Sequence, residues 1–129
     1  MSGFYTHIET ETLENTFFRK VLFTGPNSQL VLMALQPNED IGSEVHSEND
    51  QFFRFETGEG RVVIGDEEYV VKDGDSVVIP AGTEHNIINT SATEMLKMYT
   101  IYSPAHHPDG TIHQTKAEAM AAEEEENHD

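Results

Sequence analysis

The chain has no cysteine among its 129 residues. Disulfide bonds, zinc–thiolate sites and thiol catalysis are therefore excluded. It also has no apolar run long enough to cross a membrane, and its first residues show neither the basic region nor the apolar stretch of an export signal. These absences favour a soluble cytoplasmic protein, and the length favours one domain with a modest core.

Basic residues are scarce as well, with seven Lys and Arg against 24 Asp and Glu, which gives a formal net charge of −17. Such a surface repels phosphate backbones and anionic lipids, so nucleic acids and membranes are not expected partners. A small molecule is the expected ligand, and the charge argues weakly against a highly anionic one. We interpret the acidic run Glu123 to Glu126 as a solvated chain end.

Turn residues divide the chain into short strand patterns, with no internal repeat and no linker. Strands are predicted over residues 16–24, 29–36, 44–46, 51–56, 61–64, 67–72, 76–79, 85–90 and 94–103. Many short strands at regular spacing indicate an all-β barrel or sandwich. We expect a single domain over 1–129 with its barrel core at about 16–103. A loop, a short helix after the capping box Thr115 to Glu118, and the acidic tail are predicted within 104–129.

The most regular spacing lies between Gly74 and Asn89 and reads G-x5-P-x-G-x2-H-x3-N. A glycine turn leads into an apolar strand, and Pro80 ends the strand because it has no N–H to donate. Gly82 permits a sharp turn, and His85 then opens the next strand. This spacing resembles the second signature motif of the cupin family without departure. The resemblance covers residues 30–103 and implies a double-stranded β-helix, the jelly-roll barrel.

The first cupin motif, G-x5-H-x-H-x4-E-x6-G, can be placed around His46 in two registers. In one, His46 is the first histidine, and the acidic position then falls on a phenylalanine. In the other, His46 is the second histidine, Glu44 replaces the first and Gln51 replaces the glutamate. The second register keeps every offset, so we adopt it. It puts Asn38 at the opening glycine, and asparagine tolerates a left-handed backbone better than most residues.

In this register the resemblance implies a metal site with four ligands. The expected ligands are Glu44, His46, Gln51 and His85. Glu44 and His46 are two apart on one strand and so face the same side. The residues that follow at period two on the same faces are expected to line a substrate cavity: Phe53, Phe55, Ile87 and Asn89. The alternative for the two histidines is a structural role, in which each hydrogen-bonds inside the protein.

The donor set decides which ions suit such a site. It contains no sulfur, which disfavours Cu(I), whereas divalent Fe, Mn, Zn, Ni or Co would all be accepted. Glu44, His46 and His85 form a two-histidine, one-carboxylate triad, the arrangement typical of non-haem iron that activates dioxygen. Gln51 would be a labile fourth ligand. Glu44 is the expected catalytic residue, either holding the metal or acting as a base.

Three functions remain open. The first is a metal-dependent enzyme acting on a small molecule in the barrel, most concretely a non-haem oxygenase or dioxygenase. The second is sugar isomerisation, because the chain resembles the mannose-6-phosphate-isomerase-like cupins, whose zinc set also combines two histidines, a glutamate and a glutamine. It ranks lower because no Arg or Lys falls at an inward position of either motif. The third is a non-catalytic protein that binds a small ligand.

Other features receive plainer interpretations. The three histidines of a Pro- and Gly-rich loop are expected at the surface or in a lid rather than in a second metal site: His106, His107 and His113. Arg54 and Glu56 should form an outward pair. Residues 16–24, which precede the part of the chain that resembles cupins, are a candidate edge strand, and edge pairing makes a homodimer the expected assembly.

Overall fold

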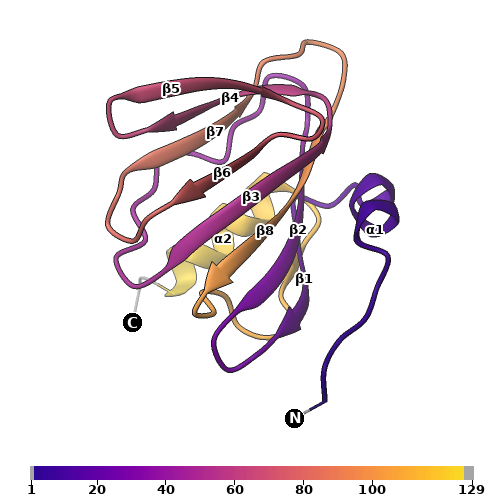
Figure 1. The fold of residues 1–129 in the computed structure, drawn as a ribbon, viewed down its shortest axis with the longest axis vertical. Coiled ribbons are helices and arrows are strands. Elements are labelled where there is room, and N and C mark those ends of the chain that lie inside the picture. The colour runs from indigo at the N-terminus through magenta and orange to yellow at the C-terminus, as the bar shows by residue number, and fades with distance from the viewer. Residues whose placement is uncertain (1, 127–129) are drawn as a thin grey trace.

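The computed structural model of the chain describes residues 2–126 and consists mainly of two antiparallel sheets around one core (Figure 1). Strands β6, β3, β8, β2, β1 and β9 follow one another in the larger sheet, and β5, β4 and β7 in the smaller. The strands are β1 (Arg19–Thr24), β2 (Gln29–Leu35), β3 (Asp50–Thr57), β4 (Glu59–Ile64), β5 (Glu67–Lys72), β6 (Ser76–Ile79), β7 (His85–Asn89), β8 (Leu96–Ser103) and β9 (Ile112–His113). The all-β prediction is confirmed.

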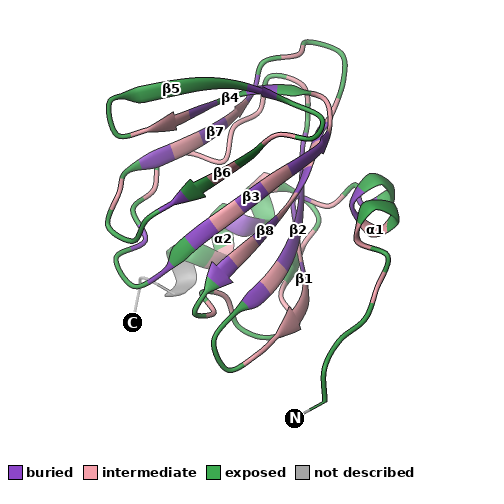
Figure 2. Cartoon of the chain, viewed as in Figure 1, coloured by how far each residue is buried: buried purple, intermediate pink, exposed green. Residues whose placement is uncertain are grey.

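Side chains alternate between the core and the outside along β3 and β8 of the larger sheet. Figure 2 shows this on β3 and β8, where buried positions alternate with less buried ones. Phe53 lies opposite Thr100 on β8, and Phe55 lies opposite Met98, so the inward faces of both strands coincide. The smaller sheet adds Val62 and other apolar residues to the same core. Period-two alternation therefore fixes which face of each strand surrounds the interior.

Two elements, α1 and β9, were not predicted from the sequence. Helix α1 (Ile8–Glu14) is only seven residues long and begins at His7, whose ring accepts a hydrogen bond from the Thr10 N–H at 3.3 Å. So short a helix has no readable periodicity, and it is stabilised by packing against β2, β3 and β8. Strand β9 has only two residues and pairs with β1 at Arg19 and Lys20. Strand β9, rather than β1, is thus the outermost strand of this sheet, and it covers β1 at Arg19 and Lys20, so the edge-strand prediction for residues 16–24 is wrong for that part.

The C-terminal helix α2 (Lys116–Glu126) confirms the prediction from the capping box. The Thr115 hydroxyl accepts a hydrogen bond from the Glu118 N–H at 3.1 Å, and the Glu118 carboxylate accepts one from the Gln114 N–H at 2.7 Å. Ala119 belongs to the hydrophobic core, so the helix docks on the barrel. Neither helix in residues 2–126 is long and apolar enough to span a membrane. Residues 127–129 of the predicted acidic tail lie outside the described part.

Residues 36–46 run beside β7 and extend the smaller sheet without forming a regular strand. The Ile41 N–H donates to the Ile87 carbonyl at 2.9 Å, and isolated bridges join residues 40 and 44 to β7. Two positive φ angles interrupt the ladder, 63° at Asn38 and 107° at Gly42. The left-handed backbone expected at Asn38 is confirmed, whereas the strand predicted over 44–46 is reduced to a single bridge.

The close packing of the inward-facing side chains predicts that truncating one of them strongly destabilises the fold. Replacing the fully buried Phe55 with alanine should lower the free energy of unfolding by about 3–5 kcal/mol, because it leaves a cavity between the sheets. Val70 is 87% exposed, so Val70→Ala is the matched control and should change stability by less than about 0.5 kcal/mol. Urea unfolding followed by far-UV circular dichroism measures both. Equal effects of the two substitutions would contradict the assignment of the inward face.

Candidate metal centre

Backbone pairing places Glu44 and His85 next to each other. The N–H of each donates to the carbonyl of the other at 2.9 Å, so the two residues are a directly opposed antiparallel pair. Side chains of such a pair project on the same side. His46 follows two residues after Glu44, and its carbonyl accepts from the Gly82 N–H at 2.9 Å. Gly82 has a φ of 83°, which a side chain would strain, so the corner before β7 also fixes His46.

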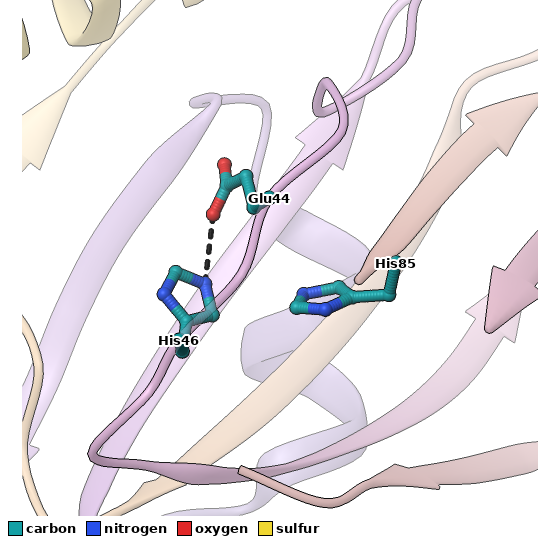
Figure 3. Close-up of side chains that lie close together, drawn as sticks. All are labelled: Glu44, His46 and His85. Carbon is teal, nitrogen blue, oxygen red and sulfur yellow. Dashed lines mark ion pairs between the residues drawn. The ribbon is translucent and has the colours of Figure 1, made fainter. Parts of the chain in front are cut away.

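The three side chains converge where β7 begins, at His85. One ligand atom from each of Glu44, His46 and His85 lies within 4.8 Å of the other two (Figure 3). His46 Nε2 is 2.7 Å from Glu44 Oε2, and the two imidazole centroids are 5.2 Å apart. Both histidines are buried, whereas the Glu44 side chain is 24% exposed. The group is therefore enclosed on the imidazole side and open on the carboxylate side.

The hydrogen bonds of the imidazoles leave the inner nitrogens available. His85 Nδ1 is 3.0 Å from the Thr83 carbonyl, so Nδ1 carries the proton and Nε2 keeps its lone pair. His46 Nε2 is buried and, despite its short distance to Glu44, is not aligned for a hydrogen bond. Buried polar atoms normally have a partner, and a second-shell carbonyl that fixes the tautomer is typical of metal-ligating histidines. These residues therefore fit a divalent metal ion.

The electrostatics of the group favour the forms that bind cations. Burial opposes the ionisation of Glu44, yet contact with His46 and its charge hold the pKa of the carboxyl below its ordinary value. The positive charge of Arg19, and that of His85 when it is protonated, act in the same direction. Burial lowers the pKa of His85, and its hydrogen bond to Thr83 only partly offsets this. An ionised carboxylate and a neutral imidazole are what metal coordination requires.

Gln51, the fourth predicted ligand, faces the same interior from β3. It lies opposite Tyr102 of β8, and the Tyr102 ring is 5.7 Å from that of His46. Its Nε2 donates to the Thr100 hydroxyl at 3.0 Å, while its Oε1 is buried without a partner. The orphaned oxygen matches the chemistry of a neutral amide ligand, and ligation by Gln51 stays a prediction.

The four residues predicted to line a cavity divide into two groups. Phe53, Phe55 and Ile87 are at most 1% exposed and belong to the closed hydrophobic core, and their contact with a substrate stays a prediction. Asn89 is held by hydrogen bonds. Its Nδ2 donates to three carbonyls, those of Leu35, Gln36 and Glu94, and its Oδ1 accepts from the Ser91 N–H. Asn89 thus ties neighbouring loops together, and its contact with a substrate also stays a prediction.

The loop after β8 lies against the candidate centre. The His106 ring is 4.3 Å from that of His46 and is exposed on its other side, so it forms part of the rim. Gln29 fixes the loop, because its Oε1 accepts from the N–H groups of His106 and His107 and its Nε2 donates to the His107 carbonyl. Among residues 2–126, no second cluster of metal-binding side chains includes these histidines.

Sequence reasoning missed the position of Arg19. It is 2% exposed and shares the inward face of β1 with Val21, a core residue. The segment lies outside both motifs, so motif spacing does not reveal it. The alternation of Arg19 with Val21 is the signal that could have found it. Arg54, in contrast, pairs with Glu56 at 2.7 Å on the other face of β3, with a half-exposed guanidinium and a buried carboxylate.

Comparison with known proteins agrees with the fold. The family model of the cupin domain matches residues 31–102. The chain belongs to the cupin family.

Relatives of high identity span most of the chain. The uncharacterized protein L612 of Acanthamoeba polyphaga mimivirus is 49% identical over 112 residues, which are 84% of this chain and 70% of L612. The uncharacterized protein YrkC of Bacillus subtilis is 46% identical over 127 residues, or 94% of this chain and 68% of YrkC. The crystal structure of BH2720 from Bacillus halodurans is 46% identical with a TM-score of 0.90, covering 93% of this chain and 95% of that one.

The half-buried His107 of the rim loop predicts that stability depends on pH. Burial, together with the charge of Arg19, holds the pKa of His107 far below its ordinary value. Below about pH 6.5 the unfolded chain therefore takes up a proton that the folded protein does not, and stability is lost. In metal-free protein, the wild type should lose about 1 kcal/mol relative to His107→Gln between pH 7.5 and 5.5. Urea unfolding at both pH values measures it, and a pH-independent difference would contradict the burial of a neutral imidazole.

Proposed function

We propose that the protein is a metal-dependent enzyme that acts on a small molecule bound between its sheets. The proposed ligands of a divalent transition metal are Glu44, His46 and His85, with Gln51 as a weaker fourth. The observation that carries the proposal is the convergence of two buried imidazoles and one carboxylate within 4.8 Å. Its support is that Gln51 Oε1 is buried without a hydrogen-bond partner, and that His46 Nε2 is buried 2.7 Å from the Glu44 carboxylate.

When bound, a divalent metal ion acts as a Lewis acid on substrate oxygens, and iron or manganese can also exchange electrons with dioxygen. The chain's own residues set the conditions. Glu44 stays ionised at the open side, where its carboxylate can hold a cation or accept a substrate proton. His85 is oriented by the Thr83 carbonyl. His106 and the loop that Gln29 holds in place lie against His46, where they limit the access of water to the centre.

Among reaction classes, we favour a non-haem oxygenase or dioxygenase. Two histidines and one carboxylate are the donor set of non-haem iron enzymes that use dioxygen, and that set is the part of the predicted site whose atoms lie together. Such a site leaves positions open for both a substrate and dioxygen.

A sugar isomerase is the second candidate, and one observation favours it more than the sequence did. Arg19 is an inward cation, so the absence of a positive group inside the motifs does not mean its absence from the barrel. The buried oxygen of Gln51 also suits a site of two histidines, a glutamate and a glutamine. The third candidate, a non-catalytic protein that binds a small ligand, needs the same centre but shows no turnover. A homodimer is compatible with each of these three functions.

Removing one ligand should abolish tight metal binding. His85→Ala should weaken the binding of Co²⁺ more than about 100-fold, because loss of an inner ligand exceeds the 10–100-fold effect of outer partners. Glu44→Gln should weaken it in the same direction. The controls are His7→Ala and Glu48→Gln, whose wild-type side chains are exposed and outside the centre. Calorimetric titration of the metal-free proteins provides the affinities.

The nature of the metal and its reaction separate the candidates. Elemental analysis of natively purified protein should find one divalent ion per chain. Stoichiometric iron with dioxygen uptake on a panel of small organic substrates supports the oxygenase, and stoichiometric zinc with aldose–ketose conversion supports the isomerase. Protein that retains no divalent ion and takes up no Co²⁺ refutes the metal-centred function.

A further inference from the structure

The side-chain amide of Gln51 is buried, and its two ends have different surroundings. Gln51 is 3% exposed, and its Nε2 donates to the Thr100 hydroxyl oxygen at 3.0 Å. Its Oε1 is buried without a hydrogen-bond partner. Thr100 is fully buried as well, so the contact between the two side chains is shielded from solvent. An amide nitrogen can only donate and an amide oxygen can only accept, so Thr100 holds one end of the amide and the other end stays available.

The strand register places this amide at the end of the interior that holds the candidate metal centre. Gln51 lies directly opposite Tyr102 of β8, and the Tyr102 ring is 5.7 Å from the ring of His46. Side chains of directly opposed residues are neighbours, with Cβ atoms about 4.5–5.5 Å apart. Asp50, the residue before Gln51, accepts a hydrogen bond from the Ala81 N–H at 2.9 Å, in the corner that leads to β7. The amide and the centre therefore share the end of the interior where β7 begins.

We infer that Thr100 is a positioning residue of the metal centre, which holds the nitrogen end of the Gln51 amide and so leaves the oxygen end to bind the ion. The inference rests on the proposed function and deepens it, because it explains how a neutral amide serves as the fourth ligand. A cation attracts the carbonyl oxygen and repels the NH₂ group, so only one of the two orientations of the amide contributes to binding. Outer partners that fix the orientation of a ligand are typical of metal sites.

A purely structural role of Thr100 makes a different prediction. Loss of a buried hydrogen bond between β3 and β8 would then loosen the barrel, and metal binding would weaken whether or not Gln51 is present. A positioning residue acts through Gln51 alone, so its effect on metal binding disappears once residue 51 has no amide. The diagnostic quantity is the change in Co²⁺ affinity caused by Thr100→Val, measured once with Gln51 in place and once in the Gln51→Leu protein. This is a double-mutant cycle, which isolates the coupling between two side chains.

The experiment is a calorimetric titration of Co²⁺ into the metal-free proteins. Thr100→Val keeps the shape of the side chain and should weaken Co²⁺ binding about tenfold or more, because the amide nitrogen is left buried without a partner. Thr100→Ser should restore most of the affinity, and Thr100→Ala carries the test if Thr100→Val does not fold. Gln51→Leu should weaken binding to a similar degree, and adding Thr100→Val to it should cause no further loss. The matched control is Thr12→Val, which removes another fully buried hydroxyl, bonded to the Ile8 carbonyl at 2.7 Å, and should bind Co²⁺ as the wild type does.

The outcomes distinguish this inference from the metal-centred function. A loss of Co²⁺ affinity on Thr100→Val that is absent from the Gln51→Leu protein and reversed by serine supports the positioning role. No loss on Thr100→Val, an equal loss with and without Gln51, or the same loss on Thr12→Val overturns it. If Gln51→Leu binds Co²⁺ as tightly as the wild type while His85→Ala does not, the positioning role is overturned and the metal-centred function stands. A wild type that takes up no Co²⁺ refutes both.

Discussion

The antiparallel pairing of residues 40–46 with β7 is the constraint on which the centre depends. Its two hydrogen bonds at Glu44 and His85 bring together residues 41 positions apart in the chain and point their side chains the same way. A shift of one residue would turn Glu44 and His46 to the outer face, since side chains alternate along an extended segment. The corner at Gly82 limits such a shift, because its N–H is bound to the His46 carbonyl.

The interior has two distinct regions. Below the centre, apolar side chains from both sheets and α2 fill the space between the sheets. At the end where β7 begins, polar groups are buried. His46 Nε2 lies 2.7 Å from the Glu44 carboxylate, and Gln51 Oε1 has no hydrogen-bond partner. A buried oxygen left unsatisfied is costly, and this cost supports the proposal that Gln51 is a ligand.

The sequence predicted the elements whose signal is local. The spacing from Gly74 to Asn89 located a strand, a corner and a histidine, and the choice of register placed Glu44 beside His46. It could not predict α1 or β9, because seven and two residues carry too little periodicity. It could not predict the hydrogen bonds of the Asn89 side chain, since their partners include carbonyls of a segment distant in sequence. The burial of Arg19 likewise depends on β9 and α2, which cover it in the folded protein only.

The central claim is that two imidazoles and one carboxylate bind a common ion, and X-ray absorption spectroscopy of the metal-loaded protein tests it most directly. At the metal edge, the account predicts scattering from two imidazole rings, with the remaining ligands oxygen and no contribution from sulfur. The spectrum of the His85→Ala protein, loaded at saturating metal, should retain one ring. A spectrum with oxygen neighbours alone, as for an ion bound at the acidic surface, would contradict the account.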